Sequence, residues 1–402
     1  MPPESIVERF AMIQPVILAA KRTPVGRFLG GLSRTPAPQL GAYAIQAVLE
    51  EVPAAKDHVD EAIFGCALQA GVGQNPARQA GLKAGLPDTL NAQTINKVCG
   101  SGLQSVMLAA QSIKAGDNQL VLAGGFENMS LAPHMDYLRT GVKFGDSKMI
   151  DHMAHDGLSC PFEGWAMGCA ADYIARKHGI SREEQDRFAA QSHHRAAEAT
   201  GKCFFKPEIV SLAAEQLKQK QGVENDEGSR ADSSVEKLAK LKSVFDADGT
   251  VTAGNASQIS DGAAALIVAS PAKAEEIAAD PIAWIVDYHT AGVAPKEIFD
   301  APAKGLKALL ARNKLTIDDI DLFELNEAFA AQVLANINEI DLPEAKLNIC
   351  GGAIALGHPI GASGARVLTT LLHQMIRTGA RRGIASLCLG GGNAVSMLVE
   401  RN

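Results

Sequence analysis

Apolar residues after position 100 recur at intervals of three and four, which is the spacing of one buried face of an α-helix. A short apolar run at 120–123 then ends in two glycines and is typical of a strand. The segment therefore predicts a helix followed by a strand. The apolar positions of the helix are Leu103, Val106, Met107, Ala110 and Ile113.

The same order of segments occurs twice along the chain. A helical stretch at 44–50 leads to a strand-like run at 59–65, and a helical stretch at 306–310 leads to a run at 320–326. Gly65 corresponds to Asn326 and Cys99 to Gly361, at nearly the same offset. Each copy continues into an apolar strand that ends in glycines, at 120–125 and at 384–392. The repetition indicates an internal duplication.

Strand, helix and strand in succession predict mixed or parallel sheets that are covered by helices. Two such halves that face each other across a pseudo-twofold axis would bring equivalent loops together. Cys99 would then lie near the glycine-rich segments of the second half.

The region at 128–254 differs from both copies. Its stretch at 215–242 is polar, and Gly222 and Gly228 interrupt helix formation there. We expect part of this region to be a solvated surface excursion, and the alternative is an insertion that covers a substrate.

Composition narrows the class of protein. A chain of 402 residues with 47% hydrophobic residues can bury a large core and form two or more structural units. A net charge of -7 argues against a nucleic-acid partner, because phosphate neutralisation needs a dense basic face. A few local Arg and Lys side chains could still bind an anionic small molecule.

The 7 cysteines are odd in number, scattered and free of any C-x-x-C pair. This pattern fits neither a disulfide framework nor a metal site and favours a reducing, cytoplasmic location. Glu4, Glu8 and Arg9 interrupt any N-terminal targeting segment, and no apolar run approaches the roughly 18 residues of a membrane span. We therefore expect no membrane partner.

Cys99 directly precedes the helix predicted above. The positive end of a helix dipole and its unpaired backbone N–H groups favour a thiolate, so we expect a nucleophilic sulfur near neutral pH. His358 lies in a glycine-rich turn before the corresponding helix of the second copy, and an imidazole suits the role of base. The alternative for His358 is a structural histidine with satisfied hydrogen bonds.

Two further positions have alternative interpretations. Cys388 ends an apolar strand and is either an inert buried thiol or a proton carrier, and Gly390 could present its N–H group to an oxyanion. Asn326 is either the cap of a following helix or an amide that holds a water or an oxyanion. Glu327 beside it could orient a neighbour.

Four segments of this chain, taken together, resemble the thiolases from about Val16 to the C-terminus. They are N-K-V-C-G-S-G at 96–102, N-E-A-F-A at 326–330, G-G-A-I-A-L-G-H-P-I-G-A-S-G-A-R at 351–366 and C-L-G-G-G at 388–392.

The resemblance implies a thiolase-like α/β fold, a duplicated five-layered αβαβα core of two similar halves with an inserted loop domain. The N-terminal half would comprise 1–127 plus 255–280, and the C-terminal half would comprise 281–402. The inserted loop domain at 128–254 would bind coenzyme A (CoA) and, through the loop at 130–148, form a homotetramer as a dimer of dimers.

The resemblance also implies an acyltransferase reaction. Two acetyl-CoA molecules would condense reversibly in a Claisen reaction to acetoacetyl-CoA and CoA, or a 3-ketoacyl-CoA would be cleaved by CoA. Cys99 would carry the acyl group, His358 would activate it, and Cys388 would act on the substrate α-carbon. No cofactor is implied, since the CoA thioesters are substrates. The alternative is a 3-ketoacyl-CoA thiolase of broader or longer chain specificity in fatty-acid β-oxidation.

Two anion sites follow from the same resemblance. His358, with a water held by Asn326, would stabilise the enolate, while the N–H groups of Cys99 and Gly390 would stabilise the tetrahedral adduct. The positions expected to contact the CoA substrate are Arg230, Ser257, Met167 and Phe329.

Two positions depart from the family pattern, and they bear on which acyl chain the protein prefers. Ala166 replaces a histidine that the acetoacetyl-specific members usually carry, and Cys350 replaces a common asparagine.

Two other functions compete with the thiolase interpretation. A decarboxylating condensing enzyme would need no second thiol, so Cys388 argues against it. A non-catalytic CoA-binding scaffold would not need Cys99, His358 and Cys388 together.

Overall fold

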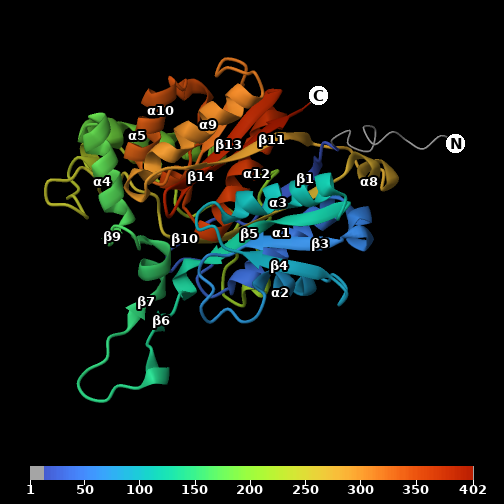
Figure 1. The fold of residues 1–402 in the computed structure, drawn as a ribbon, viewed down its shortest axis with the longest axis horizontal. Coiled ribbons are helices and arrows are strands. Elements are labelled where there is room, and N and C mark those ends of the chain that lie inside the picture. Colours follow the sequence, from blue (N-terminus) through green and yellow to red (C-terminus); the bar gives the residue numbers. More distant parts are fainter. Residues whose placement is uncertain (1–12, 402) are drawn as a thin grey trace.

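A single mixed sheet runs through both halves of this computed structural model, which describes residues 13–401 (Figure 1). The acidic N-terminal positions Glu4 and Glu8 lie outside these residues. The strand order is β12-β13-β14-β11-β1-β10-β5-β3-β4, and β2 pairs with β10. The strands of this sheet are β1 (Val16–Arg22), β2 (Gly26–Arg27), β3 (Glu61–Gly65), β4 (Asn91–Ile95), β5 (Leu120–Asn128), β10 (Ser260–Ala269), β11 (Ala283–Gly292), β12 (Leu322–Leu325), β13 (Arg382–Leu389) and β14 (Asn393–Glu400).

The two halves repeat one topology, as the sequence predicts. The N-terminal order β3-β5-β10-β1 matches the C-terminal order β12-β13-β14-β11. In each half the first pair is parallel and the following pairs are antiparallel. The halves join where β1 pairs with β11 at Val16↔Trp284 and Ile17↔Ala283. The predicted mixed, duplicated sheet is thus confirmed.

Helices form three layers around the two half-sheets. The central helices α3 and α12 pack against each other and each contacts strands of both halves. On the outer faces, α1 and α2 cover the N-terminal strands, and α9 covers the C-terminal strands with α10 beside it. This is the expected αβαβα order. The helices are α1 (Ala37–Glu51), α2 (Pro76–Lys83), α3 (Ser101–Ala115), α8 (Pro271–Glu276), α9 (Ala301–Arg312), α10 (Ala330–Ile340), α11 (Ala353–Leu356) and α12 (Ile360–Thr378).

Glycines allow the two central helices to touch at their backbones. A Cβ atom on Gly364 of α12 would lie 2.2 Å from the backbone N of Leu103, and one on Gly102 of α3 would lie 2.6 Å from the backbone N of Ala365. Side chains at these positions would push the helices apart. The contact lies just after Cys99 and His358, so it also brings the loops of the two halves together.

Gly364→Ala is expected to lower the free energy of unfolding by about 1–3 kcal/mol, because the added methyl group meets rigid backbone rather than a flexible side chain. Chemical denaturation measures the change. Gly201→Ala is the matched control, since a Cβ there has no neighbour within 4 Å. An unchanged unfolding midpoint in Gly364→Ala would contradict the close contact.

The region at 128–254 forms a layer of helices and short strand pairs beside the core. The polar stretch within it contains only α6 and α7, two helices of 4 residues each. A loop between β6 and β7 projects away from the body of the molecule (Figure 1) and exposes Tyr137, Leu138, Val142 and Phe144. The elements of this region are β6 (His134–Met135), β7 (Ile150–Asp151), β8 (Ser159–Cys160), β9 (Trp165–Ala166), α4 (Met167–His178), α5 (Arg182–Gly201), α6 (Ala214–Leu217) and α7 (Val235–Leu238).

No helix within 13–401 combines the length and the apolar character that crossing a bilayer requires. The same residues contain no cluster of three or more His, Cys, Asp or Glu side chains that could hold a metal ion. All of the cysteines are free.

Candidate active site

Cys99, His358 and Cys388 line one cavity of about 760 Å³, although they are far apart in the sequence. The first half contributes Cys99, the second half contributes His358 and Cys388, and residues between 156 and 168 and at 244–245 form one wall. The region at 128–254 therefore borders the cavity. The lining of the cavity also includes Gly390, Met167, Ser257, Arg230 and Phe329.

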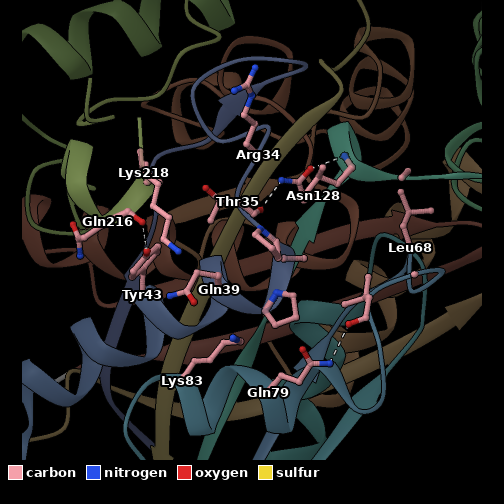
Figure 2. A pocket seen from close by; sticks show the side chains of 18 of the residues that line it. Arg34, Thr35, Gln39, Tyr43, Leu68, Gln79, Lys83, Asn128, Gln216 and Lys218 are labelled. Atoms are coloured by element: carbon pink, nitrogen blue, oxygen red, sulfur yellow. Dashed lines mark hydrogen bonds between the residues drawn. The ribbon is translucent and has the colours of Figure 1, made fainter. Parts of the chain in front are cut away.

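A larger cavity of about 1030 Å³ lies between α1, α2 and the α6 segment (Figure 2). Gln39, Lys83 and Lys218 reach into it from these three elements. Among the described residues that line it there is no cysteine or histidine. Size alone thus does not locate the candidate site, and the chemistry of the lining selects the smaller cavity.

A strained turn holds Cys99 at the start of α3. Val98 adopts a positive φ of 48°, and its N–H group donates to Asn96 Oδ1 at 2.9 Å. The Ser101 hydroxyl accepts from Lys97 N at 2.8 Å and donates to Val98 O at 2.7 Å. A residue with a β-branched side chain rarely adopts this conformation without such support.

Burial changes the expected protonation of Cys99. Its side chain packs between two apolar clusters, one of which contains Met129 and Ile360. Burial raises the pKa of the Cys99 thiol to about 12, although the backbone N–H groups of Gly390 and of Cys99 itself act in the opposite direction. The expectation of a thiolate near neutral pH is therefore wrong for the resting protein, because desolvation outweighs the helix start. A base must take the proton when the sulfur reacts.

His358 is oriented to act as that base. Its Nδ1 lies 2.5 Å from Ser363 Oγ, and the Ser363 hydroxyl donates to Pro359 O at 2.8 Å. Because Ser363 uses its only proton on the carbonyl, His358 Nδ1–H must donate to Ser363, which leaves Nε2 unprotonated. Burial, with Arg366 nearby, lowers the pKa of His358 to about 3. The imidazole is consequently neutral near pH 7 and can accept a proton at Nε2.

Ser363→Ala removes the acceptor that fixes the tautomer of His358. We expect kcat to fall about tenfold to a hundredfold, since loss of alignment alone can cost about a hundredfold. Steady-state rates measure this effect. Ser363→Thr retains the hydroxyl and serves as the comparison, and equal activity in Ser363→Ala and wild type would refute the role of Ser363.

Asn326 is fully buried behind His358. Its Nδ2 lies 3.5 Å from His358 Nε2, and its Oδ1 has no hydrogen-bond partner among the described residues. The following helix α10 begins after Phe329 without a side-chain cap. The helix-cap interpretation of Asn326 is therefore wrong, and its amide faces the candidate base instead.

Cys388 and Gly390 complete the group at the end of β13. Cys388 is 2% exposed, and burial together with the neighbouring Cys99 raises the pKa of its thiol well above the ordinary value. The N–H group of Gly390 acts on the Cys99 thiol and lowers its pKa, against the larger effect of burial. Gly391 and Gly392 both have positive φ angles, of 88° and 85°, which glycine adopts at little cost.

The predicted substrate contacts border the same cavity. Arg230 is exposed and Met167 and Ser257 are half-buried. Phe329 is buried against Phe299, with the ring centroids 5.5 Å apart. Ala166 also lines the cavity, whereas Cys350 is buried elsewhere, beside Ala355 and Leu356.

Sequence reasoning missed two residues that shape the site. The Phe245 ring packs on Gly168, where a Cβ would lie 2.1 Å away, and meets Phe329 edge-on. Buried Glu127 accepts hydrogen bonds from the N–H groups of Ala67, Leu68 and Gly361, and so ties the two halves together beside Cys99. The sequence signal for Phe245 was an aromatic residue just after the polar stretch at 215–242.

Comparison with known proteins assigns the family. The protein-family model for the thiolase N-terminal domain matches residues 15–272, and the one for the thiolase C-terminal domain matches residues 279–401. The chain belongs to the thiolase family and is an acyltransferase.

Individual relatives are similar over nearly their whole length. The acetyl-CoA acetyltransferase of Chromobacterium violaceum is 49% identical over 97% of this chain and 100% of the relative. A probable acetyl-CoA acyltransferase of Staphylococcus aureus is also 49% identical, over 97% of this chain and 100% of its own length. The crystal structure of the Bacillus anthracis acetyl-CoA acetyltransferase superposes with a TM-score of 0.94 at 40% identity and covers 97% of this chain and 99% of that one.

Proposed function

We propose that the protein joins two acetyl-CoA molecules into acetoacetyl-CoA and CoA, and catalyses the reverse thiolytic cleavage, through an acyl-enzyme on Cys99. The observation that carries the proposal is the meeting of two thiols and a neutral imidazole in one cavity with the Gly390 N–H group. The names of the similar relatives support acetyl-CoA as the substrate.

In the first half-reaction His358 Nε2 takes the Cys99 proton as the sulfur attacks the thioester carbon. The N–H groups of Cys99 and Gly390 stabilise the oxyanion of the adduct. The bond from that carbon to the CoA sulfur then breaks, and the departing thiolate receives the proton from His358. The acetyl group is left on Cys99.

In the second half-reaction the Cys388 proton first passes to His358 Nε2. The resulting Cys388 thiolate then removes a proton from the methyl group of another acetyl-CoA, and the enolate oxygen is stabilised by His358, now protonated at Nε2, and by Asn326. The carbanion attacks the acetyl carbon, so a carbon–carbon bond forms and the bond to the Cys99 sulfur breaks. The released Cys99 sulfur takes the proton back from His358 Nε2, which restores the resting thiols and the neutral imidazole. In the cleavage direction Cys388, held as a thiol by burial, returns the proton to the leaving carbanion.

The proposal also includes the contacts to CoA and the assembly of subunits. Arg230 at the exposed rim would bind CoA phosphates, and Ser257, Met167 and Phe329 would contact the rest of the substrate. The projecting loop between β6 and β7 exposes apolar side chains that a homotetramer would cover, and light scattering tests this.

Ala166 supports a second candidate, a 3-ketoacyl-CoA thiolase for longer or branched chains in fatty-acid metabolism. It lines the cavity beside Met167, where a histidine would occupy more space and donate a hydrogen bond. A kcat/KM series over 3-ketoacyl-CoA chain lengths separates the two candidates. Preference for the four-carbon substrate alone would exclude the second.

The direct test of the proposal is the loss of the acetoacetyl-CoA enolate absorbance when the protein is mixed with CoA. Absence of CoA-dependent cleavage with any 3-ketoacyl-CoA would refute a thiolase activity. Consumption of malonyl substrates that is independent of Cys388 would favour a decarboxylating condensing enzyme instead. Tight CoA binding without acetylation of Cys99 would favour the non-catalytic scaffold.

A further inference from the structure

Two polar contacts link the C-terminal end of strand β12 and the residue after it to the first turns of helix α12 and the loop before it. The first joins Asn326 Nδ2 to His358 Nε2, in the loop before α12, at 3.5 Å. The second joins Glu324 Oε2 to Arg366 Nη1 at 3.8 Å. Glu324 and Asn326 are two positions apart in extended chain, so their side chains lie on the same face. The backbone N–H of Asn326 still donates to Ser386 O, which continues the strand pairing.

The two residues of α12 that take part, Ser363 and Arg366, lie on one face of the helix. Ser363 and Arg366 are three positions apart and therefore neighbours on the helix surface. Ser363 accepts the hydrogen bond that orients His358. The face that fixes the imidazole thus also presents Arg366 to Glu324.

Arg366 and Glu324 are buried without close hydrogen bonds. Each is 2% exposed, and neither the three guanidinium nitrogens nor Glu324 Oε2 have a hydrogen-bond partner among residues 13–401. Apolar residues of similar volume commonly stabilise a core as well as a buried ion pair does. Stability of the fold therefore does not account for this pair.

We propose that Glu324 and Arg366 are positioning residues, which set the approach of β12 to α12 and thereby hold the Asn326 amide against His358. The inference rests on the proposed function, because it assigns the pair to the anion site of that reaction. The contact of 3.5 Å between Asn326 and His358 is too long to fix this geometry by itself. A second link between the same two elements supplies the missing constraint.

The charges around Arg366 leave it available to act on His358. Arg22 is neutralised by Glu208 at 2.6 Å and Asp226 at 2.7 Å, and Glu327 accepts three hydrogen bonds. Within residues 13–401 the ion-pair partner of Arg366 is Glu324, at 3.8 Å. Burial and then the positive charge of Arg366 lower the pKa of His358. Removal of Arg366 should therefore raise that pKa. The charged or titratable groups that act on the pair are Arg22, Arg195, Glu208, Glu327, Cys350 and His358.

The experiment compares Arg366→Met, Arg366→Lys and Glu324→Gln in the full chain, with acetoacetyl-CoA and CoA as substrates. Arg377→Met is the matched control, because Arg377 lies on the same helix but stacks on Phe204 at 4.0 Å. We expect kcat to fall about tenfold to a hundredfold in Arg366→Met and Glu324→Gln, with KM changed less than about threefold. The acid limb of kcat/KM should move to higher pH in Arg366→Met, and Arg366→Lys should restore part of kcat.

The two proposals fail in different ways. A wild-type protein without thiolytic activity refutes the proposed function itself. If the wild type is active, a folded Glu324→Gln variant with kcat within about twofold of the control refutes the positioning role, as does an unmoved pH profile in Arg366→Met. Glu324→Gln keeps the shape of the side chain, so it decides the question even if Arg366→Met does not fold.

Discussion

Cys99→Ala is expected to abolish both directions of the reaction, with a loss of kcat of roughly 10⁴-fold or more. In the proposed reaction this sulfur receives the acyl group, so its removal leaves the first half-reaction without a nucleophile. After exposure to acetyl-CoA, peptide mass spectrometry should find one acetyl group on Cys99 of the wild type and none on the variant. Cys203→Ala is the matched control, because Cys203 is exposed and does not line the cavity.

An acetyl group on Cys388 in the wild type would contradict this assignment. Full activity in Cys99→Ala would do so as well. Either result would require another residue of the cavity to carry the acyl group.

Cys388→Ala is expected to separate the two half-reactions. Acetylation of Cys99 should continue at close to the wild-type rate, while condensation and cleavage should fall about 10²- to 10⁴-fold, which is the usual contribution of a positioned acid or base. Rapid-quench measurement of acetyl-enzyme formation, alongside the steady-state rate, gives both quantities. Equal loss in both half-reactions would show that Cys388 is not confined to the carbon acid step.

Local sequence pattern was sufficient to predict the central helix and the duplication. The apolar spacing after Ser101 forms α3, and the repeated segments become the matching strands β3 and β12. The helix follows from short-range periodicity and the duplication from the repeated order of segments, so neither needs knowledge of tertiary contacts. The order of the strands across both halves was not available from periodicity, and the five layers came from the resemblance to thiolases.

The candidate site was predictable in its members but not in its electrostatics. Cys99, His358 and Cys388 do share a cavity, yet the helix start at Cys99 suggested a thiolate, while burial raises the pKa of this thiol. Desolvation depends on residues from distant segments, such as Met129 and Ile360, which the sequence around Cys99 does not specify. The Asn326 amide was ambiguous for the same reason, since only the tertiary structure shows whether it caps a helix.

One wall of the cavity comes from the region at 128–254, whereas the groups proposed to react come from the duplicated core. The shape of the cavity and the chemistry therefore depend on different parts of the chain. Residues between 156 and 168 and at 244–245 border the cavity. Variant libraries that aim at a larger or smaller acyl group can therefore begin with those two segments. Selection for new products would then proceed without disturbing the nucleophile, its base or the contact between the central helices.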